Sequence, residues 1–223
     1  MECLFDEDKP HFATWLWIHL DLMSTMYPEK PGAVPLYRAT LLGFRDLAAH
    51  LIAEHPEHVN AGDDLQVTAV YAAAKNGNTD ILSLLLEHDA NVDSRDSVGA
   101  TSLHWVSAEG RCDVGQCLLD HGADINARDN SGLTPLFDAA RNGSFEFVQM
   151  LLERGAVIDF RNDEGRTPLS LAVGWGRIQV ARLLLKHGAD VNARDLSGGT
   201  PSQFTMQQEI LELLFEYGSE SVK

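Results

Sequence analysis

Few groups of residues in this chain have side-chain types and spacings that could support chemistry. Cys117 and His121 lie four residues apart, which would place both on one face of a helix and could suit a metal ion. Acidic residues cluster at 6–8 and at 63–64, where paired carboxylates could act as acid and base if a cleft held them. We interpret both acidic clusters as solvated turn residues.

The sequence contains no recognisable catalytic constellation. G-x-S-x-G, H-E-x-x-H, C-x-x-C and a Walker phosphate-binding loop are all missing. His88, His121 and His187 share one position of the 33-residue repeat, so the histidine belongs to a structural pattern rather than to a metal site. We therefore expect no enzyme activity and no catalytic, cofactor-binding or metal-ligating residues. The alternative is an enzyme, or an enzyme's regulatory subunit, that uses no familiar motif.

Composition argues against several classes of function. Lys and Arg total 17 against 33 Asp and Glu, for a formal net charge of −16, which argues against a nucleic-acid or anionic-membrane binder. The charge favours a basic partner or simply a solvated acidic surface. The three cysteines form no disulfide framework. Cys117 shares its repeat position with Met150 and Leu183, and we expect it to be buried.

The sequence also carries indications of compartment. Residues 1–8 are acidic where a secretory signal would be basic. The longest apolar stretch, 15–23, is interrupted by polar residues and is too short to cross a bilayer. We expect an intracellular protein, cytoplasmic, with no membrane partner. We expect it to be a monomer or part of a larger multidomain chain.

The elements that position these side chains follow a period of 33 residues. One series of threonines keeps that step without exception: Thr68, Thr101, Thr134, Thr167 and Thr200. Two series of glycines keep the same step: Gly77, Gly110, Gly143 and Gly176, and then Gly122, Gly155 and Gly188. A fixed period in this range indicates a repeat array.

Residues 134–159 show the physics of one unit. Thr134 is predicted to be a helix N-cap whose hydroxyl accepts a backbone N–H, and Pro135 suits the first helical position. Gly143 is predicted to end this helix in a left-handed conformation. The apolar residues of 145–152 then form the stripe of a second helix. One unit cannot bury this stripe alone, so units must stack.

The unit resembles the ankyrin repeat. The helix-opening motif reads TPLFDAA at 134–140, TSLHWVS at 101–107 and TPLSLAV at 167–173, and the closing phrase reads LLDHGADIN at 118–126 and LLKHGADVN at 184–192. The resemblance covers about Pro35 to Gly218. It implies an all-α solenoid, elongated and curved, of helix–turn–helix repeats joined by β-hairpin loops. It also implies non-catalytic protein–protein recognition, as an adaptor, an inhibitor or a sensor arm.

The period places the repeats along the chain. We predict an ankyrin-repeat domain over 35–223, with repeats at about 35–66, 67–99, 100–132, 133–165 and 166–198 and a truncated C-terminal cap at 199–223. Residues 1–34 are predicted to be a helical cap and linker. The helix at 10–26 is apolar on almost every side, so it covers the first repeat or joins a partner or a further domain. Residues 10–46 also resemble the start of repeat arrays in fungal NACHT-type (STAND, NLR-like) receptors.

Candidate partner-binding residues are those that vary between units while the framework recurs. The resemblance implies that the first helices and the hairpins form a concave binding face. The candidates before the capping glycines and in the hairpins are Lys75, Asn76, Glu109, Leu133, Arg141, Asn142 and Arg166. Trp175 occupies a repeat position that is polar in other units. It is either a binding hot spot or a ring that lies flat over its own neighbours.

A row of basic residues precedes the hairpin turns. Its members recur at the 33-residue step: Arg95, Arg128, Arg161 and Arg194. Either each arginine pairs with acidic groups on adjacent hairpins, or the row forms a docking edge for an acidic partner segment.

Overall fold

The computed structural model describes residues 35–62 and 66–218. In these ranges the regular elements are eleven α-helices and two short 3-10 helices, and the only bridge pairing is an isolated one between Gly62 and Thr68. The predicted all-α repeat fold is confirmed. The predicted aromatic helix at 10–26 lies outside the described residues.

The chain divides into two compact units, the first ending at Ser97 and the second beginning at Val98. The first unit contains α2 (Pro35–Leu41), α3 (Arg45–Glu54), the 3-10 helix η1 (Pro56–His58), α4 (Ala69–Asn76) and α5 (Thr79–Glu87). The second contains α6 (Ser102–Glu109), α7 (Cys112–Asp120), α8 (Pro135–Asn142), α9 (Phe145–Glu153), α10 (Pro168–Gly174), α11 (Ile178–Lys186), the 3-10 helix η2 (Pro201–Phe204) and α12 (Gln208–Glu216).

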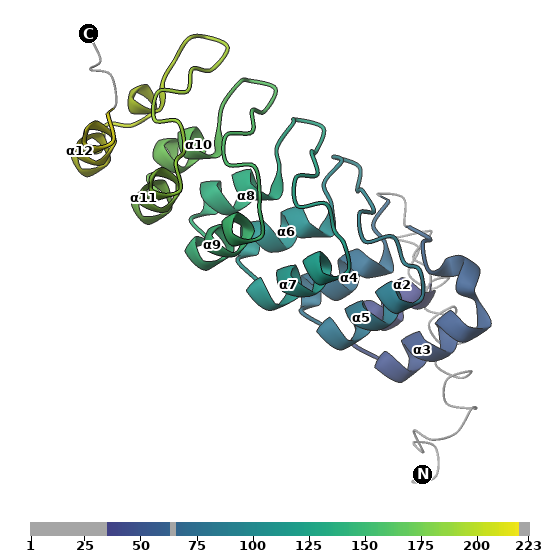
Figure 1. The fold of residues 1–223 in the computed structure, drawn as a ribbon. Helices are drawn as coiled ribbons and strands as arrows, with labels where there is room; N and C mark the ends of the chain where they lie inside the picture. Colours follow the sequence, from purple (N-terminus) through teal and green to yellow (C-terminus); the bar gives the residue numbers. More distant parts are fainter. Residues whose placement is uncertain (1–34, 63–65, 219–223) are drawn as a thin grey trace. The chain divides into compact units, whose positions relative to one another are not determined.

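Each unit is built from helix pairs that stack in two layers (Figure 1). In the second unit the first helices pack in the order α6, α8, α10, and η2 continues that layer. The second helices pack in the order α7, α9, α11, α12. In the first unit α2 packs on α4, and α3 packs on α5. Consecutive repeats therefore bury one another's apolar faces, as the periodic sequence requires.

The core lies between the two helix layers. Ala139 and Ala140 are fully buried, and these small residues let neighbouring helices approach closely. Phe147 and Leu151 in α9 are also fully buried. Each buried side chain of this size contributes about 1.5–3 kcal/mol to stability relative to an exposed one.

The first helices begin and end as the period predicts, with one correction. Thr134 has the extended backbone of an N-cap, and Gly143 ends α8 in the left-handed conformation at φ 82°. The predicted hydroxyl cap is wrong, however, because the buried Thr134 hydroxyl has no hydrogen-bond partner within the described residues. The Thr101 and Thr167 hydroxyls pair with polar side chains three positions later, His104 and Ser170. The Thr200 hydroxyl pairs with the Ser202 hydroxyl at 3.1 Å. Three positions after Thr134 lies Phe137, which has no polar atom in its side chain to bond back.

The loops between repeats are hairpin turns without assigned strands. In the second unit the Asp129 N–H donates to the Leu133 carbonyl at 2.9 Å. The Leu133 N–H donates in turn to the Asp129 carboxylate at 2.9 Å. Each hairpin also bonds to the next, since the Leu196 N–H donates to the Glu164 carbonyl at 2.9 Å. These bonds fix the hairpins beside the first helices.

A second set of bonds joins consecutive repeats at the ends of the second helices. The Asn126 side chain accepts from the Val157 N–H at 2.9 Å, and Asp159 accepts from the Asp190 N–H at 3.1 Å. Burial is the main cause that raises the pKa of Asp159. In these two repeats one polar side chain therefore satisfies a backbone donor of the following repeat.

Three positions depart from the regular unit. Asp89 takes the repeat position that Gly122, Gly155 and Gly188 hold in later repeats, and it adopts a left-handed φ of 60°. In the truncated last repeat the first helix is only the 3-10 turn η2. Gly115 lies inside α7 and does not cap it: a Cβ on Gly115 would lie 2.5 Å from Phe147 Cζ.

Candidate partner-binding surface

A depression of about 450 Å³ opens in the second unit where the first helices meet the hairpins. The sequence-predicted residues that it brings together are Leu133, Arg141, Arg166 and Trp175. Leu171 adds a further apolar wall, and the hairpin segments 130–131 and 162–164 supply polar groups. The depression therefore combines an apolar patch with hydrogen-bonding groups on a rigid frame.

Trp175 supplies the aromatic ring of this depression, and its side chain is 60% exposed. It is the C-cap residue of α10, directly before the left-handed Gly176, so the turn projects its side chain from the end of the helix. The ring is thus not flattened into the core. An exposed indole beside Leu133 and Leu171 offers apolar area and one N–H donor.

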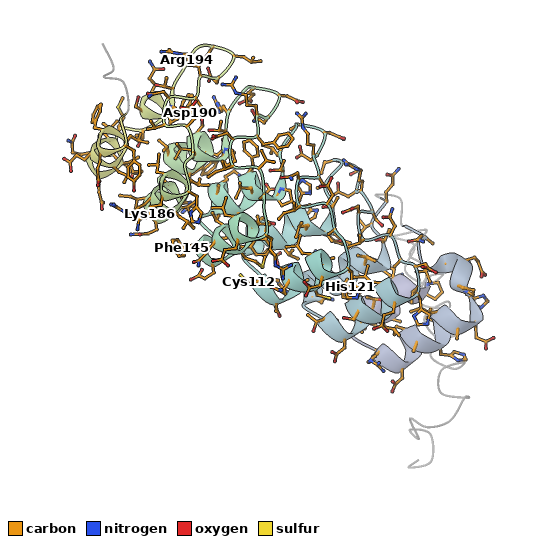
Figure 2. The ribbon with its side chains drawn as sticks, viewed as in Figure 1. Cys112, His121, Phe145, Lys186, Asp190 and Arg194 are labelled. Atoms are coloured by element: carbon orange, nitrogen blue, oxygen red, sulfur yellow. The ribbon has the colours of Figure 1, made fainter. Side chains whose placement is uncertain are left out.

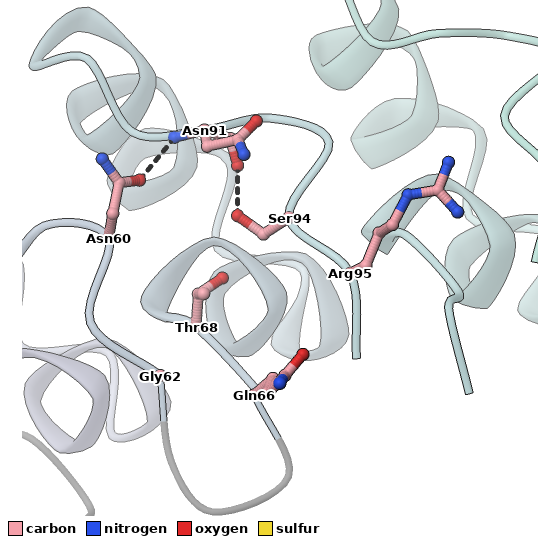
Figure 3. A pocket seen from close by; sticks show the side chains of 7 residues that line it. All are labelled: Asn60, Gly62, Gln66, Thr68, Asn91, Ser94 and Arg95. Atoms are coloured by element: carbon pink, nitrogen blue, oxygen red, sulfur yellow. Dashed lines mark hydrogen bonds between the residues drawn. The ribbon is translucent and has the colours of Figure 1, made fainter. Parts of the chain in front are cut away.

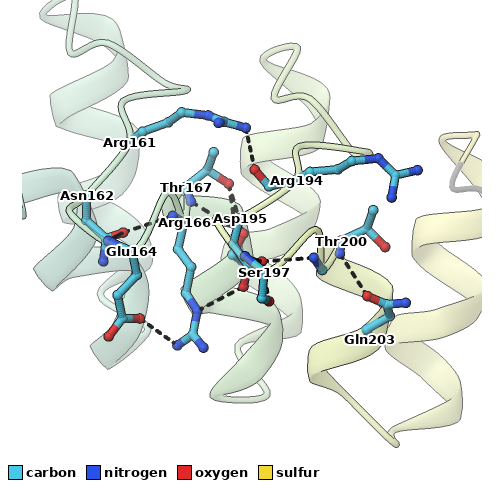
Figure 4. A network of polar contacts seen from close by, with 12 residues as sticks. Arg161, Asn162, Glu164, Arg166, Thr167, Arg194, Asp195, Ser197, Thr200 and Gln203 are labelled. Atoms are coloured by element: carbon cyan, nitrogen blue, oxygen red, sulfur yellow. Dashed lines mark hydrogen bonds and ion pairs between the residues drawn. The ribbon is translucent and has the colours of Figure 1, made fainter.

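Arg166 is held in a network that joins its own hairpin to the next repeat (Figure 4). Its guanidinium lies 3.1 Å from the Glu164 carboxylate and 3.7 Å from Asp195, and it stacks 4.9 Å from the ring centre of Phe204. The Ser197 side chain donates a hydrogen bond that lowers the pKa of Asp195. Arg166 is therefore a fixed wall of the depression whose charge is already balanced.

Arg141 is paired with an unusual carboxyl group. Its guanidinium lies 3.2 Å from Asp138 Oδ1, and Asp138 is only 8% exposed. Burial raises the pKa of Asp138 to about 7, although Arg141 opposes the shift. Sequence reasoning missed Asp138, although the signal was present: the equivalent positions hold Trp105 and Leu171.

The predicted arginine row engages neighbouring hairpins in the second unit. Arg128 lies 3.1 Å from the Asp163 carboxylate and 5.5 Å from the ring centre of Phe160. Arg161 donates to the Arg194 carbonyl at 2.6 Å (Figure 4), and Arg194 donates to the Gly198 carbonyl of its own hairpin at 3.1 Å. Of these three arginines, Arg128 contacts an acidic group on the next hairpin, whereas Arg161 and Arg194 contact backbone carbonyls.

The first unit holds the remaining candidates of the row and of the first helices. Arg95 lines a polar depression of about 490 Å³ together with Asn60, Gly62, Gln66, Thr68, Asn91 and Ser94 (Figure 3). Lys75 lies 5.8 Å from the ring centre of Tyr71, and Asn76 donates to the Leu41 carbonyl at 2.5 Å. The structure does not bring these three candidates into one site.

Comparison with known proteins identifies the family. A family model described as ankyrin repeats in three copies matches residues 36–129 and 126–195. The chain belongs to the ankyrin-repeat family. A segment of 57 residues is also 37% identical to BCL-6 corepressor-like protein 1 of the mouse (Mus musculus), covering 26% of this chain and 3% of that protein.

Two further candidates on the ankyrin repeats of the second unit are tied down locally. Glu109 pairs with Arg111 at 2.5 Å. Asn142 donates to the Asp138 carbonyl at 2.9 Å. Neither Glu109 nor Asn142 lines the depression.

Trp105, which sequence reasoning did not single out, is 41% exposed on α6, the neighbouring first helix.

Cys117 and His121 lie near the end of α7, and the histidine ring is held by its own helix. The thiol lies 3.9 Å from His121 Nδ1, but that nitrogen donates to the Cys117 carbonyl at 2.8 Å. The prediction that Cys117 is buried is wrong, because the residue is partly exposed beside the end of α7. Figure 2 labels His121, at the end of α7, and Arg194, in a hairpin loop.

Across the part of the chain that the structure describes, every helix is too short or too polar to cross a membrane.

Proposed function

We propose that this ankyrin-repeat chain is a non-catalytic module that binds a protein partner through the depression in its second unit. The observation that carries the proposal is the exposed Trp175 ring beside Leu133 and Leu171. A bulky aromatic at the edge of a hydrogen-bonding depression is typical of a binding hot spot. The family supports the same role, since ankyrin repeats are in general protein–protein interaction modules.

The lining defines what kind of partner segment fits. The arginines have acidic partners within the chain, Arg141 with Asp138 and Arg166 with Glu164. The free energy of binding must then come mainly from apolar contact with Trp175 and from hydrogen bonds to the hairpins. We infer that the partner presents an extended or helical segment with a bulky apolar side chain.

The finer parts of the proposal concern the role in the cell. We propose an intracellular, cytoplasmic adaptor or inhibitor, or the sensor arm of a larger receptor of the NACHT type. A monomeric chain, or this chain as one part of a longer protein, fits each of these roles. The net charge of −16 favours protein partners over nucleic acid or anionic membranes.

The test compares two single substitutions of exposed aromatic residues in the second unit. Wild type, Trp175→Ala and Phe215→Ala are immobilised at equal density and exposed to native lysate, and captured proteins are quantified by mass spectrometry. Phe215 is the control because it is 46% exposed but lies on α12, outside the depression. Unchanged melting of both variants shows that they are folded.

We expect a set of captured proteins whose recovery falls about tenfold or more with Trp175→Ala. Their recovery should stay at wild-type level with Phe215→Ala. A tenfold fall corresponds to a loss of about 1.4 kcal/mol in binding free energy, as expected for a hot-spot residue. If no captured protein depends on Trp175, the depression is not the binding site. A hydrolase assay with generic ester, phosphate and glycoside substrates tests the non-catalytic part, and turnover by the purified chain would refute it.

A further inference from the structure

The end of the first repeat is built differently from the ends of the later repeats. At the position of the left-handed Gly122, Gly155 and Gly188 the first repeat has Pro56. The proline ring fixes φ near −65°, so the chain cannot make the left-handed turn. It continues instead from α3 into the 3-10 turn η1, Pro56–His58.

This 3-10 turn places two histidines on one side of the backbone. Side chains three residues apart eclipse one another in a 3-10 helix. His55 and His58 have this spacing, and their rings stack with centres 5.3 Å apart and an interplanar angle of 27°. Glu57 lies between them in the sequence and extends its carboxylate to the same side, within reach of both rings.

The Nδ1 atom of His55 has a different partner from the Nδ1 atoms of the equivalent histidines in later repeats. In His88, His121 and His187, Nδ1 lies 2.8–2.9 Å from the helix carbonyl four residues earlier and so donates to it. At His55 the same nitrogen lies 3.3 Å from Glu57 Oε1 instead. The ring has therefore turned from its own helix toward a carboxylate.

The three donor atoms have the separations that a small cation needs. His55 Nδ1 lies 3.3 Å and His58 Nε2 lies 3.9 Å from Glu57 Oε1, and the three groups have ligand atoms within 4.8 Å of one another. With zinc–ligand bonds of about 2.0–2.2 Å, tetrahedral ligands stand about 3.3–3.5 Å apart. Small rotations of these partly exposed side chains would close the remaining difference.

The backbone beneath the cluster is held on both sides. The His58 N–H donates to the His55 carbonyl at 3.0 Å, and the adjacent Val59 side chain is buried. Asn60 then accepts from the Asn91 N–H at 2.7 Å and so ties the segment to the next repeat.

We propose that His55, Glu57 and His58 are the protein ligands of a metal site that binds one first-row divalent cation, Zn²⁺. Two imidazoles and one carboxylate suit zinc, whereas calcium and magnesium take oxygen ligands and copper(I) takes sulfur. Three protein ligands leave a fourth position open to water or to a donor from another molecule. The ion joins the end of α3 to η1, in the repeat that lacks the glycine turn.

The experiment titrates Zn²⁺ into the full-length, tag-free chain in competition with a chromophoric chelator. His55→Ala and His58→Ala are each expected to weaken binding of one equivalent at least about tenfold, since changes even to outer-shell residues reach that size. The double variant loses that equivalent. His121→Ala is the matched control, because this histidine shares the repeat position of His55 but is held by its helix.

Ring proton resonances of the histidines provide a second measurement that does not depend on stoichiometry. Addition of Zn²⁺ is expected to shift the signals of His55 and His58, assigned from the alanine variants, and to leave that of His121 in place. The inference is overturned if the double variant binds as many equivalents as wild type with equal affinity. It is also overturned if the two assigned signals do not respond to Zn²⁺.

Discussion

Asp138 is the residue whose ionisation matters most to this fold. Its neighbours in the layer of first helices carry Trp105 and Leu171 at the same repeat position, so a carboxyl group stands where the array otherwise has apolar side chains. It is 8% exposed, with Arg141 at 3.2 Å. A charge in such a place costs stability unless its partner compensates fully, and the raised pKa shows that compensation here is incomplete.

The pKa of Asp138 predicts how stability changes with pH. Because it rises from 3.8 to about 7 on folding, the folded state holds a proton that the unfolded state releases between these values. Stability therefore falls as pH rises through this interval and levels off above about 7. The shift corresponds to a ceiling of about 4 kcal/mol, at about 1.4 kcal/mol per unit of pKa.

Asp138→Asn removes this ionisation while keeping the shape of the side chain. We expect the variant to be more stable than wild type at pH 8, by roughly 1–4 kcal/mol, with a smaller gain at pH 5. Urea unfolding at the two pH values measures both gains. Asp163→Asn is the control, since this exposed carboxylate pairs with Arg128 at the surface and should change stability little. Equal gains at both pH values for Asp138→Asn would contradict the assignment.

At the scale of elements, the contact between α7 and α9 depends on a missing side chain. Gly115 lies in the middle of α7, where its absent Cβ makes room for the ring of Phe147. Phe147 is fully buried and so cannot easily move aside. The usual gain of about 1 kcal/mol from replacing a helical glycine by alanine should therefore be reversed here.

Gly115→Ala is expected to destabilise the chain by about 1–3 kcal/mol, because the new methyl group overpacks the interface between the two helices. Chemical denaturation of the single variant measures the loss. Phe147→Leu in the same chain should recover part of it, whereas Gln116→Ala, at an exposed position of α7, should be close to neutral. A stabilised Gly115→Ala variant would show that the helices adjust without cost.

The helices were predictable because recurring residues mark where they begin and end in each repeat. The series of threonines and glycines located the helix pairs, and Gly143 has the left-handed backbone that was expected. Thr134 was misjudged although Phe137, three positions later in the same repeat, has no polar side-chain atom to pair with its hydroxyl. The role of Gly115 in close approach depends on Phe147 of the next repeat, and so on packing that no single repeat reveals.

The candidate site was predictable in part. Variation between repeats picked out Leu133, Arg141, Arg166 and Trp175, and the structure places these four around one depression. The same argument also selected Glu109 and Asn142, which are occupied by local contacts. A sequence shows which positions the fold leaves variable, but the contacts of each side chain depend on the neighbouring repeat.

At the scale of the molecule, stability is a sum over interfaces between neighbouring repeats. The short last repeat closes one end of the second unit, since α12 packs on α11 and η2 packs on α10. Deleting residues 199–223 would expose apolar side chains of both helices. We expect this truncated chain to lose solubility or to melt at a clearly lower temperature.

A milder change tests the same closing role if the truncated chain cannot be purified. Leu214→Ala removes a fully buried side chain of α12 and should cost about 2–5 kcal/mol. Glu216→Ala, an exposed residue of the same helix, should be close to neutral. A truncated chain that melts like wild type and stays monodisperse would show that the last repeat does not cap the unit.

The central claim, that a partner binds where the first helices meet the hairpins, is tested most directly by hydrogen–deuterium exchange on the complex with a captured partner. We expect slower exchange in the segments that line the depression, residues 130–141 and 162–175, and unchanged exchange in α9 and α11. With Trp175→Ala this protection should weaken at equal partner concentration. Protection confined to α9 and α11, with the hairpins exchanging as in the free chain, would contradict the account.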